Sequence, residues 1–123
     1  MLHFAMSITG QGSASEPLVV PFDDVLTALG VLPRMFIEPD GSFVWTGEGK
    51  DRTRWQVDGN LIDRGDVLAY VDVNGCCPEK HFDDLLRAFG WPEAPLAFQL
   101  TRSGQTLEEA AFRELARSAN GAM

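Results

Sequence analysis

The segment Asn74–His81, which reads NGCCPEKH, holds the residue types best suited to chemistry in this chain. We expect it to connect a strand to a helix and to place Cys77 near the first turn of that helix. Backbone N–H groups at a helix N-terminus stabilise a thiolate, so Cys76, Cys77 and His81 are candidate ligands for a soft metal. Adjacent thiolates chelate one metal poorly, however. The alternative, which we favour, is one buried cysteine and one ordinary loop cysteine.

The three tryptophans, Trp45, Trp55 and Trp91, are candidates for a stacking surface. Trp45 and Trp55 lie in two segments expected to be strands, and paired strands would bring them into one aromatic patch. A ring, a sugar or a peptide would stack on such a patch. Core packing is the better interpretation, because aromatic side chains dominate the buried surface of protein cores.

A short basic cluster, Lys50, Arg52 and Arg54, adjoins Trp55 and suggests an anion site. Asp51, Glu48 and Asp58 surround the cluster and cancel its field, so exposed ion pairs are the better interpretation. The sequence has no phosphate-binding glycine loop, nucleophile elbow, zinc-protease helix or dinucleotide-binding fingerprint. We therefore predict no catalytic residues and no cofactor.

A nine-residue pattern occurs twice, as FDDVLTALG at 22–30 and as FDDLLRAFG at 82–90. In both copies apolar residues recur at positions i, i+3, i+4 and i+7, which predicts an amphipathic helix. Pro21 and Pro78 suit helix starts, and Gly30 and Gly90 suit left-handed caps at the helix ends.

The paired aspartates of the two copies, Asp23-Asp24 and Asp83-Asp84, have two interpretations. Two neighbouring carboxylates suit a metal or acid–base chemistry. Exposed acids near the start of a helix, beside a core phenylalanine, are the simpler interpretation, because the helix dipole favours negative charge there. We favour the second.

Segments with strand character flank both predicted helices. LHFAMSIT at 2–9 alternates apolar and polar residues before the first, and DVLAYVDV at 66–73 precedes the second. RMFIE at 34–38 and PLAFQLT at 95–101 follow them. Two strand–helix–strand units, at about 1–47 and 65–104, are typical of a ferredoxin-like two-layer α+β sandwich. The fold class predicted is therefore α+β, built from two pseudo-repeated units.

Further β structure and a third helix complete the predicted domain. We expect a β-meander at about 34–74, with turns at Pro39–Gly41, at Asp58-Gly59 and in DRGD before the strand at 66–73. A helix at about 105–119 is expected to begin with a capping box formed by Thr106 and Glu109. Its apolar positions are Phe112, Leu115, Ala116 and Ala119.

Length and charge narrow the class of protein. The 123 residues fit a single domain, 1–123, with 45% hydrophobic and 23% charged residues. The formal net charge of −8, spread over both halves, disfavours nucleic acid and anionic membranes as partners. No stretch approaches the length of a membrane span, the first ten residues do not resemble a signal peptide, and two adjacent cysteines favour a cytoplasmic location.

The face of the sheet away from the helices is the predicted interaction surface. It should present a mixture of polar and apolar side chains, among them His3, Leu68, Tyr70 and Gln99. The leading hypothesis is a non-catalytic interaction module that self-associates as a homodimer, or binds another protein, through a sheet face or edge. The second hypothesis is a small-molecule or soft-metal binder using Cys76, Cys77 and His81. An enzyme with a site shared between subunits ranks third.

Overall fold

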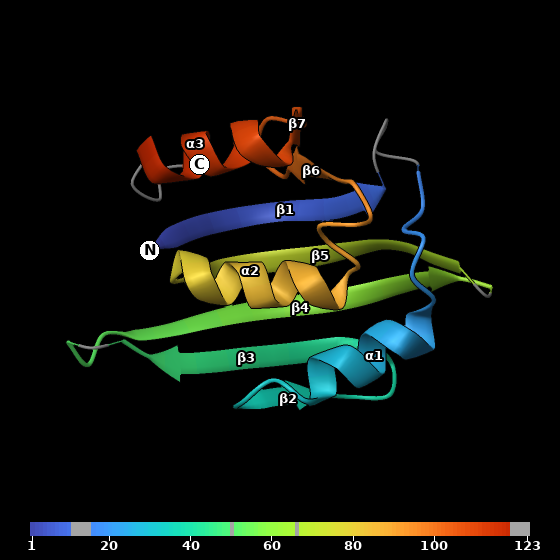
Figure 1. Cartoon of the computed structure of the whole chain (residues 1–123), viewed down its shortest axis with the longest axis horizontal. Helices are drawn as coiled ribbons and strands as arrows, with labels where there is room; N and C mark the ends of the chain where they lie inside the picture. Colours follow the sequence, from blue (N-terminus) through green and yellow to red (C-terminus); the bar gives the residue numbers. More distant parts are fainter. Residues whose placement is uncertain (11–15, 50, 66, 119–123) are drawn as a thin grey trace.

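A computed structural model describes residues 1–10, 16–49, 51–65 and 67–118 of the chain (Figure 1). Within these residues the protein is an α+β structure with seven strands in one antiparallel sheet and three helices. The elements are β1 (Leu2–Gly10), α1 (Phe22–Gly30), β2 (Met35–Ile37), β3 (Ser42–Glu48), β4 (Arg54–Arg64), β5 (Val67–Cys77), α2 (Glu79–Ala88), β6 (Leu96–Leu100), β7 (Thr106–Glu108) and α3 (Glu109–Ser118). None of the described helices is long and apolar enough to cross a lipid bilayer.

The order of the strands in the sheet is β2-β3-β4-β5-β1-β6-β7. The predicted meander corresponds to β2 through β5, which are consecutive neighbours in this sheet. β1 lies between β5 and β6, with Met6 opposite both Val73 and Leu100. The strand predicted to close the first strand–helix–strand unit, β2, instead lies at the sheet edge, whereas β6 of the second unit pairs directly with β1.

All three helices pack on one face of the sheet (Figure 1), and the buried apolar residues of β1, β3, β4, β5 and β6 form one core cluster with those of the helices. In β1 the alternation predicted from the sequence is confirmed, because Leu2, Phe4, Met6 and Ile8 are all at most 4% exposed. Phe82 of α2 is fully buried, whereas Phe22 of α1 is partly buried and packs against the core.

The two related helices begin in the same way and end differently. Pro21 and Pro78 each occupy the position before the first helical residue, in an extended conformation. Gly90 adopts a left-handed conformation after α2, with a φ of 98°, as predicted. The same prediction for Gly30 is wrong, because Gly30 is the last residue of α1 and Val31 follows it in a right-handed conformation.

Two of the three predicted turns are present, and the third is a strand. Gly41, with a φ of 97°, reverses the chain between β2 and β3, and Gly65, with a φ of 67°, does so between β4 and β5. Asp66 of the second turn lies outside the described residues. Asp58 and Gly59 lie in the middle of β4, where Gly59 pairs with Phe43. A Cβ on Gly59 would lie 2.0 Å from the Phe43 ring, so the glycine is there to accommodate this ring.

The start of the third helix also differs from the prediction. Thr106 belongs to β7 and pairs with Gln99 of β6, so it forms no capping box. Glu109 is the first residue of α3, and its carboxylate contacts Trp91 and Arg113 instead. Of the predicted apolar positions, Phe112 and Ala116 are fully buried, Leu115 is partly buried, and Ala119 lies outside the described residues.

Substitution by alanine should have opposite effects on the free energy of unfolding at Gly59 and at Gly30. Gly59→Ala should lower the free energy of unfolding by about 1–3 kcal/mol, because the new methyl group displaces the Phe43 ring. Gly30→Ala should raise it by up to about 1 kcal/mol, because a Cβ there meets nothing within 4 Å and alanine favours the helix. Urea unfolding followed by tryptophan fluorescence measures both, and equal effects would contradict the assignment of Gly59 to a packed strand.

Candidate functional site

The sheet face opposite the helices is covered by none of the described helices. On its central strands the exposed side chains form rows across the sheet, because paired residues of neighbouring strands lie side by side. One row contains Asn60, Asp72, Ser7 and Gln99. A hollow of about 630 Å³ lies over this row and the adjacent one. Its polar residues are Ser7, Asp58, Asn60, Asp72, Asn74, Gln99 and Thr101.

Hydrogen bonds within this face hold its acidic groups in place. The Ser7 hydroxyl donates to Asp72 Oδ1 at 2.6 Å, and Gln56 Nε2 donates to Asp58 Oδ1 at 2.8 Å. Asp72 and Asp58 therefore each accept one hydrogen bond from another side chain of the same face. The result is an ordered polar surface made mainly of amides, hydroxyls and partly satisfied carboxylates.

Three of the four residues predicted for the interaction surface lie on this face. His3, Tyr70 and Gln99 are partly exposed there. Leu68 is not on it, because it is 0% exposed and belongs to the core. The reason is a β-bulge in β5: Tyr70 pairs with Ile62 and Leu68 with Asp63, so Ala69 is an extra residue that shifts the alternation and turns Leu68 to the helices.

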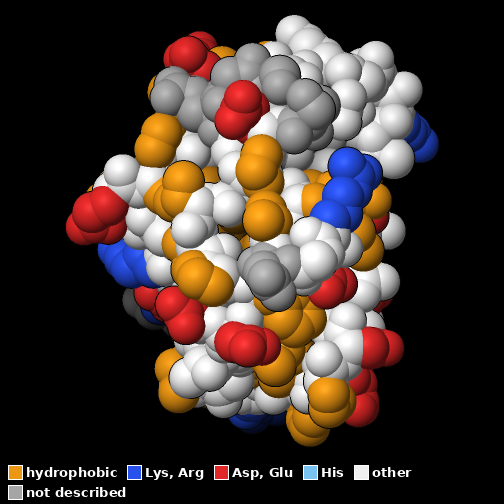
Figure 2. Space-filling model, turned by 90° about the vertical axis from the view of Figure 1, so that its right-hand side faces the viewer, with side chains coloured by type: hydrophobic (Ala, Val, Ile, Leu, Met, Phe, Trp, Pro, Cys, Tyr) orange, Lys and Arg blue, Asp and Glu red, His pale blue; other side chains and the backbone are white. Residues whose placement is uncertain are grey.

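An apolar pair extends the uncovered face at one sheet edge. Phe36 of β2 is 67% exposed and lies opposite Val44 of β3, which is 38% exposed. By comparison, Figure 2 shows the end of the molecule with the β4–β5 hairpin and the start of α1. Among the described residues at that end, hydrophobic side chains lie in several patches interspersed with polar and acidic ones (Figure 2).

The structure places the two cysteines among the candidate metal ligands on opposite faces of the sheet. Cys76 and Cys77 lie at the end of β5, opposite His3 and Leu2, and not in a strand-to-helix loop. Successive side chains of a strand point to opposite faces, so Cys76 faces the uncovered side and Cys77 the core. No group of three or more potential metal ligands is found among the described residues.

The environment of Cys77 disfavours a thiolate. Burial, followed by the neighbouring Cys76, raises the pKa of the Cys77 thiol from 9.0 to about 12. The effect is the reverse of that expected from a helix N-terminus, because the side chain lies in the core. The structure thus assigns Cys77 to hydrophobic packing, which is the alternative interpretation given above.

His81 belongs to an aromatic cluster with two of the tryptophans. Its ring lies 5.0 Å from that of Trp55 and 6.0 Å from that of Trp45, measured between centroids. The rings of Trp45 and Trp55 meet edge to face at 4.9 Å. Both tryptophans are at most 5% exposed, so they pack as core residues and not as an exposed platform. Trp91 is separate and donates its indole N–H to Glu109 at 2.9 Å.

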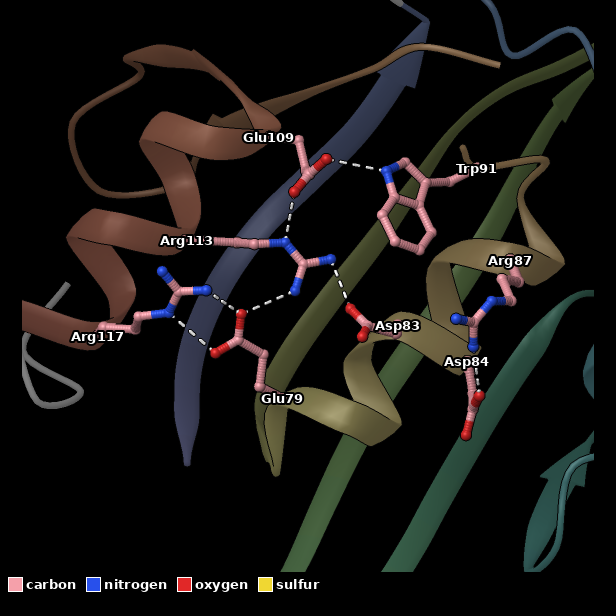
Figure 3. A network of polar contacts seen from close by, with 8 residues as sticks. All are labelled: Glu79, Asp83, Asp84, Arg87, Trp91, Glu109, Arg113 and Arg117. Atoms are coloured by element: carbon pink, nitrogen blue, oxygen red, sulfur yellow. Dashed lines mark hydrogen bonds and ion pairs between the residues drawn. The ribbon is translucent and has the colours of Figure 1, made fainter. Parts of the chain in front are cut away.

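Sequence reasoning missed a network of charged residues between α2 and α3 (Figure 3). At its centre is Arg113, whose side chain is only 8% exposed and which contacts Glu79, Asp83 and Glu109 at 2.9, 2.7 and 2.6 Å. Arg117 also binds Glu79. The contact between Arg113 and Asp83 is an ion pair without hydrogen-bond geometry.

A spacing in the sequence could have indicated this network. Glu79 and Asp83 are four residues apart on one helix, and Arg113 and Arg117 are four apart on another, so each pair lies on one helix face. The acids of the second FDD copy are therefore structural, since Asp83 binds Arg113 and Asp84 binds Arg87 at 2.9 Å. Asp23 and Asp24 of the first copy are exposed, as expected.

Comparisons of this chain with known proteins found no match. No family model matches the chain, and neither a curated protein nor a solved structure shows significant similarity to it.

The two cysteines should differ in reactivity. In a Cys77→Ser variant the remaining Cys76 should react with a thiol reagent, and in a Cys76→Ser variant the remaining Cys77 should react at least about tenfold more slowly, because its thiolate is disfavoured. Alkylation of each folded variant at pH 7.5, followed by mass spectrometry, measures the two rates. Equal rates would show that Cys77 is not buried, and labelling in urea confirms that both thiols are intact.

Glu79 should make stability depend on pH. Hydrogen bonds from Arg117 and then from Arg113 lower the pKa of Glu79 from 4.5 to about 2. Its contribution to stability is therefore fully present above pH 4.5 and is lost as the pH falls toward 2. Glu79→Gln should be less stable than the unmodified protein at pH 6, with a difference that shrinks between pH 4.5 and 2 in urea unfolding.

Arg117 provides the control for this measurement. In an Arg117→Gln background, substitution of Glu79 should produce a smaller pH-dependent difference, because the main cause of the lowered pKa is gone. A difference that is unchanged by loss of Arg117 would contradict the role given to this ion pair.

Proposed function

We propose that this chain is a non-catalytic interaction module that binds a protein partner on the uncovered face of its sheet, the first candidate being a second copy of itself. The observation that carries the proposal is the placement of α1, α2 and α3 on the same side. A sheet face that no described helix covers is a common site of association when its side chains are neither fully polar nor fully apolar.

The side chains of the face suit a symmetric partner. The amides of Gln56, Asn60, Asn74 and Gln99 each carry a donor and an acceptor, so the same groups on a second copy would complement them. A twofold interface requires this kind of self-complementarity, because the same patch is present on both sides. The small side chains of Ala5 and Ser7 at the centre of the face allow close approach of a partner.

The edges of the sheet are less suited to association than the face. β2 and β7, the two edge strands, are three residues long each. Few backbone groups are therefore available to pair with a strand from another chain. This favours the face over the edge as the interaction surface.

The central part of the fold supports a ferredoxin-like core for this module. Strands β6, β1, β5 and β4 are consecutive neighbours and antiparallel, with α1 following β1 and α2 joining β5 to β6. This is the strand order of a ferredoxin-like sandwich, with β2 and β3 as an insertion and β7 and α3 as an extension. In this interpretation the counterpart of β6 in the first unit is β4.

The test is a pair of variants that add the same charge to opposite sides of the molecule. Asn74 is exposed at the centre of the face, between Ala5 and Asp58, whereas Thr27 is exposed on α1. Sedimentation velocity over a range of concentrations should show a dimer for the unmodified protein. Asn74→Glu should weaken it at least about tenfold, because two like charges meet at a twofold interface, and Thr27→Glu should not.

Two results would contradict the proposal. One is a strict monomer at the highest concentration measured. The other is an equal effect of Asn74→Glu and Thr27→Glu, which would place the interface elsewhere or make it a general effect of charge.

A further inference from the structure

His3 and Cys76 are neighbours on the uncovered face of the sheet, although they are far apart in the sequence. They lie opposite each other in the antiparallel pairing of β1 with β5. Side chains at opposite positions on one face of a sheet have Cβ atoms about 4.5–5.5 Å apart. Both residues are partly exposed, whereas the adjacent pair, Leu2 and Cys77, is buried in the core. A thiol and an imidazole therefore lie side by side and open to solvent.

Neither side chain of this pair has a polar partner. Among the described residues, His3 and Cys76 take part in no hydrogen bond, ion pair or disulfide. Other polar residues of the face are paired, since Ser7 donates to Asp72 and Gln56 donates to Asp58. The sulfur and the ring nitrogens of the pair are therefore unused.

These two residue types together are typical zinc ligands. Structural zinc sites are tetrahedral and take four ligands, and two cysteines with two histidines are one of the usual sets. One chain supplies half of this set on the uncovered face. No group of three or more potential metal ligands occurs in the part of the chain that the structure describes. The set is completed if a second copy contributes the same two residues, as a twofold axis requires.

We propose that two copies of the chain bind one zinc ion between their uncovered faces, through His3 and Cys76 of each copy. This inference rests on the proposed association through that face, and it adds the metal that holds the two copies together. Each thiol loses its proton to solvent when zinc binds, and each imidazole binds in its neutral form. The two thiolates then balance the two positive charges of zinc.

The surroundings of the pair leave room for a metal and a second chain. β6 pairs with β1 only from Met6 onward, so His3 lies beyond the end of that strand. A hollow of about 590 Å³ is lined by Cys76 on the other side of the pair. Sheets stacked face to face lie about 10 Å apart, and zinc bonds of about 2.3 Å to sulfur and about 2.0 Å to nitrogen let side chains from both sheets reach one ion in that gap.

The charge near the pair is compatible with a neutral zinc site. The hollow beside Cys76 contains Arg34 and Arg54 against Glu48, and Arg54 lies opposite Glu48 in the pairing of β3 with β4. A zinc ion held by two thiolates and two neutral imidazoles carries no net charge, so it requires no further acid in this hollow. Asn74, the position chosen above for an added charge, lies two residues before Cys76 on the same face.

Metal titration of the full chain tests the site. The protein is first freed of metal with a chelator and kept reduced. Calorimetric titration with Zn²⁺ should give one ion for every two chains, and Co²⁺ should produce the visible absorption of a tetrahedral site with thiolate ligands. In sedimentation velocity, saturating Zn²⁺ should tighten the dimer at least about tenfold over the chelator-treated protein, because the ion binds the dimer more strongly than the monomer.

His3 and His81 form a matched pair of variants. His81 lies on the helix side of the sheet, where its ring contacts Trp45 and Trp55. His3→Gln and Cys76→Ser should each weaken zinc binding more than about tenfold, since even the loss of an outer hydrogen bond to a zinc ligand costs about that much. His81→Gln should leave zinc binding within about twofold. Urea unfolding of each variant checks that it is folded.

The outcomes separate this inference from the proposed function. A dimer that is equally tight in chelator and in Zn²⁺ overturns the zinc site and leaves the interaction surface in place. A protein that stays monomeric in both conditions overturns the two together. Binding of one zinc ion per chain overturns the shared site, and so does an equal loss of binding in His3→Gln and His81→Gln when both variants are folded.

Discussion

The contact of Phe82 with three other phenylalanines is the interaction on which the rest of the structure depends. Its ring lies 5.3 Å from that of Phe4, 6.4 Å from Phe98 and 5.6 Å from Phe112, so α2 meets β1, β6 and α3 at one point. Arg113 lies over the Phe82 ring at 5.2 Å, where a buried charge requires the surrounding carboxylates. This cluster holds two helices on one side of the sheet, and none of the described helices covers the opposite side.

Much of the fold could be predicted, because hydrophobic periodicity is a local property. The period of two in β1 and the apolar stripes of the three helices depend on residues close in sequence. The errors have long-range causes. Asp58-Gly59 resembles a hairpin turn until Phe43, from another strand, is seen to need the space above Gly59. Leu68 was placed on the wrong face because the alternation of β5 is interrupted by a bulge that the sequence pattern does not reveal.

The candidate sites were harder to predict, because they depend on which segments meet. The alternation of His3, Tyr70 and Gln99 with core positions is a local pattern, and it places these three residues on the face that no described helix covers. The charged network between α2 and α3 is different, because Arg113 meets Glu79 and Asp83 only where the two helices pack together.

The central position of β1 in the sheet affects how the protein can fold during its synthesis on the ribosome. Its partners run from Val71 to Cys77 on one side and from Leu96 to Leu100 on the other. β1 is synthesised before both of its partners, so it lacks its native neighbours until β5 and β6 have emerged. Nascent chains of this protein should consequently be good substrates for chaperones that bind extended hydrophobic segments, and early termination of translation should yield fragments that do not fold.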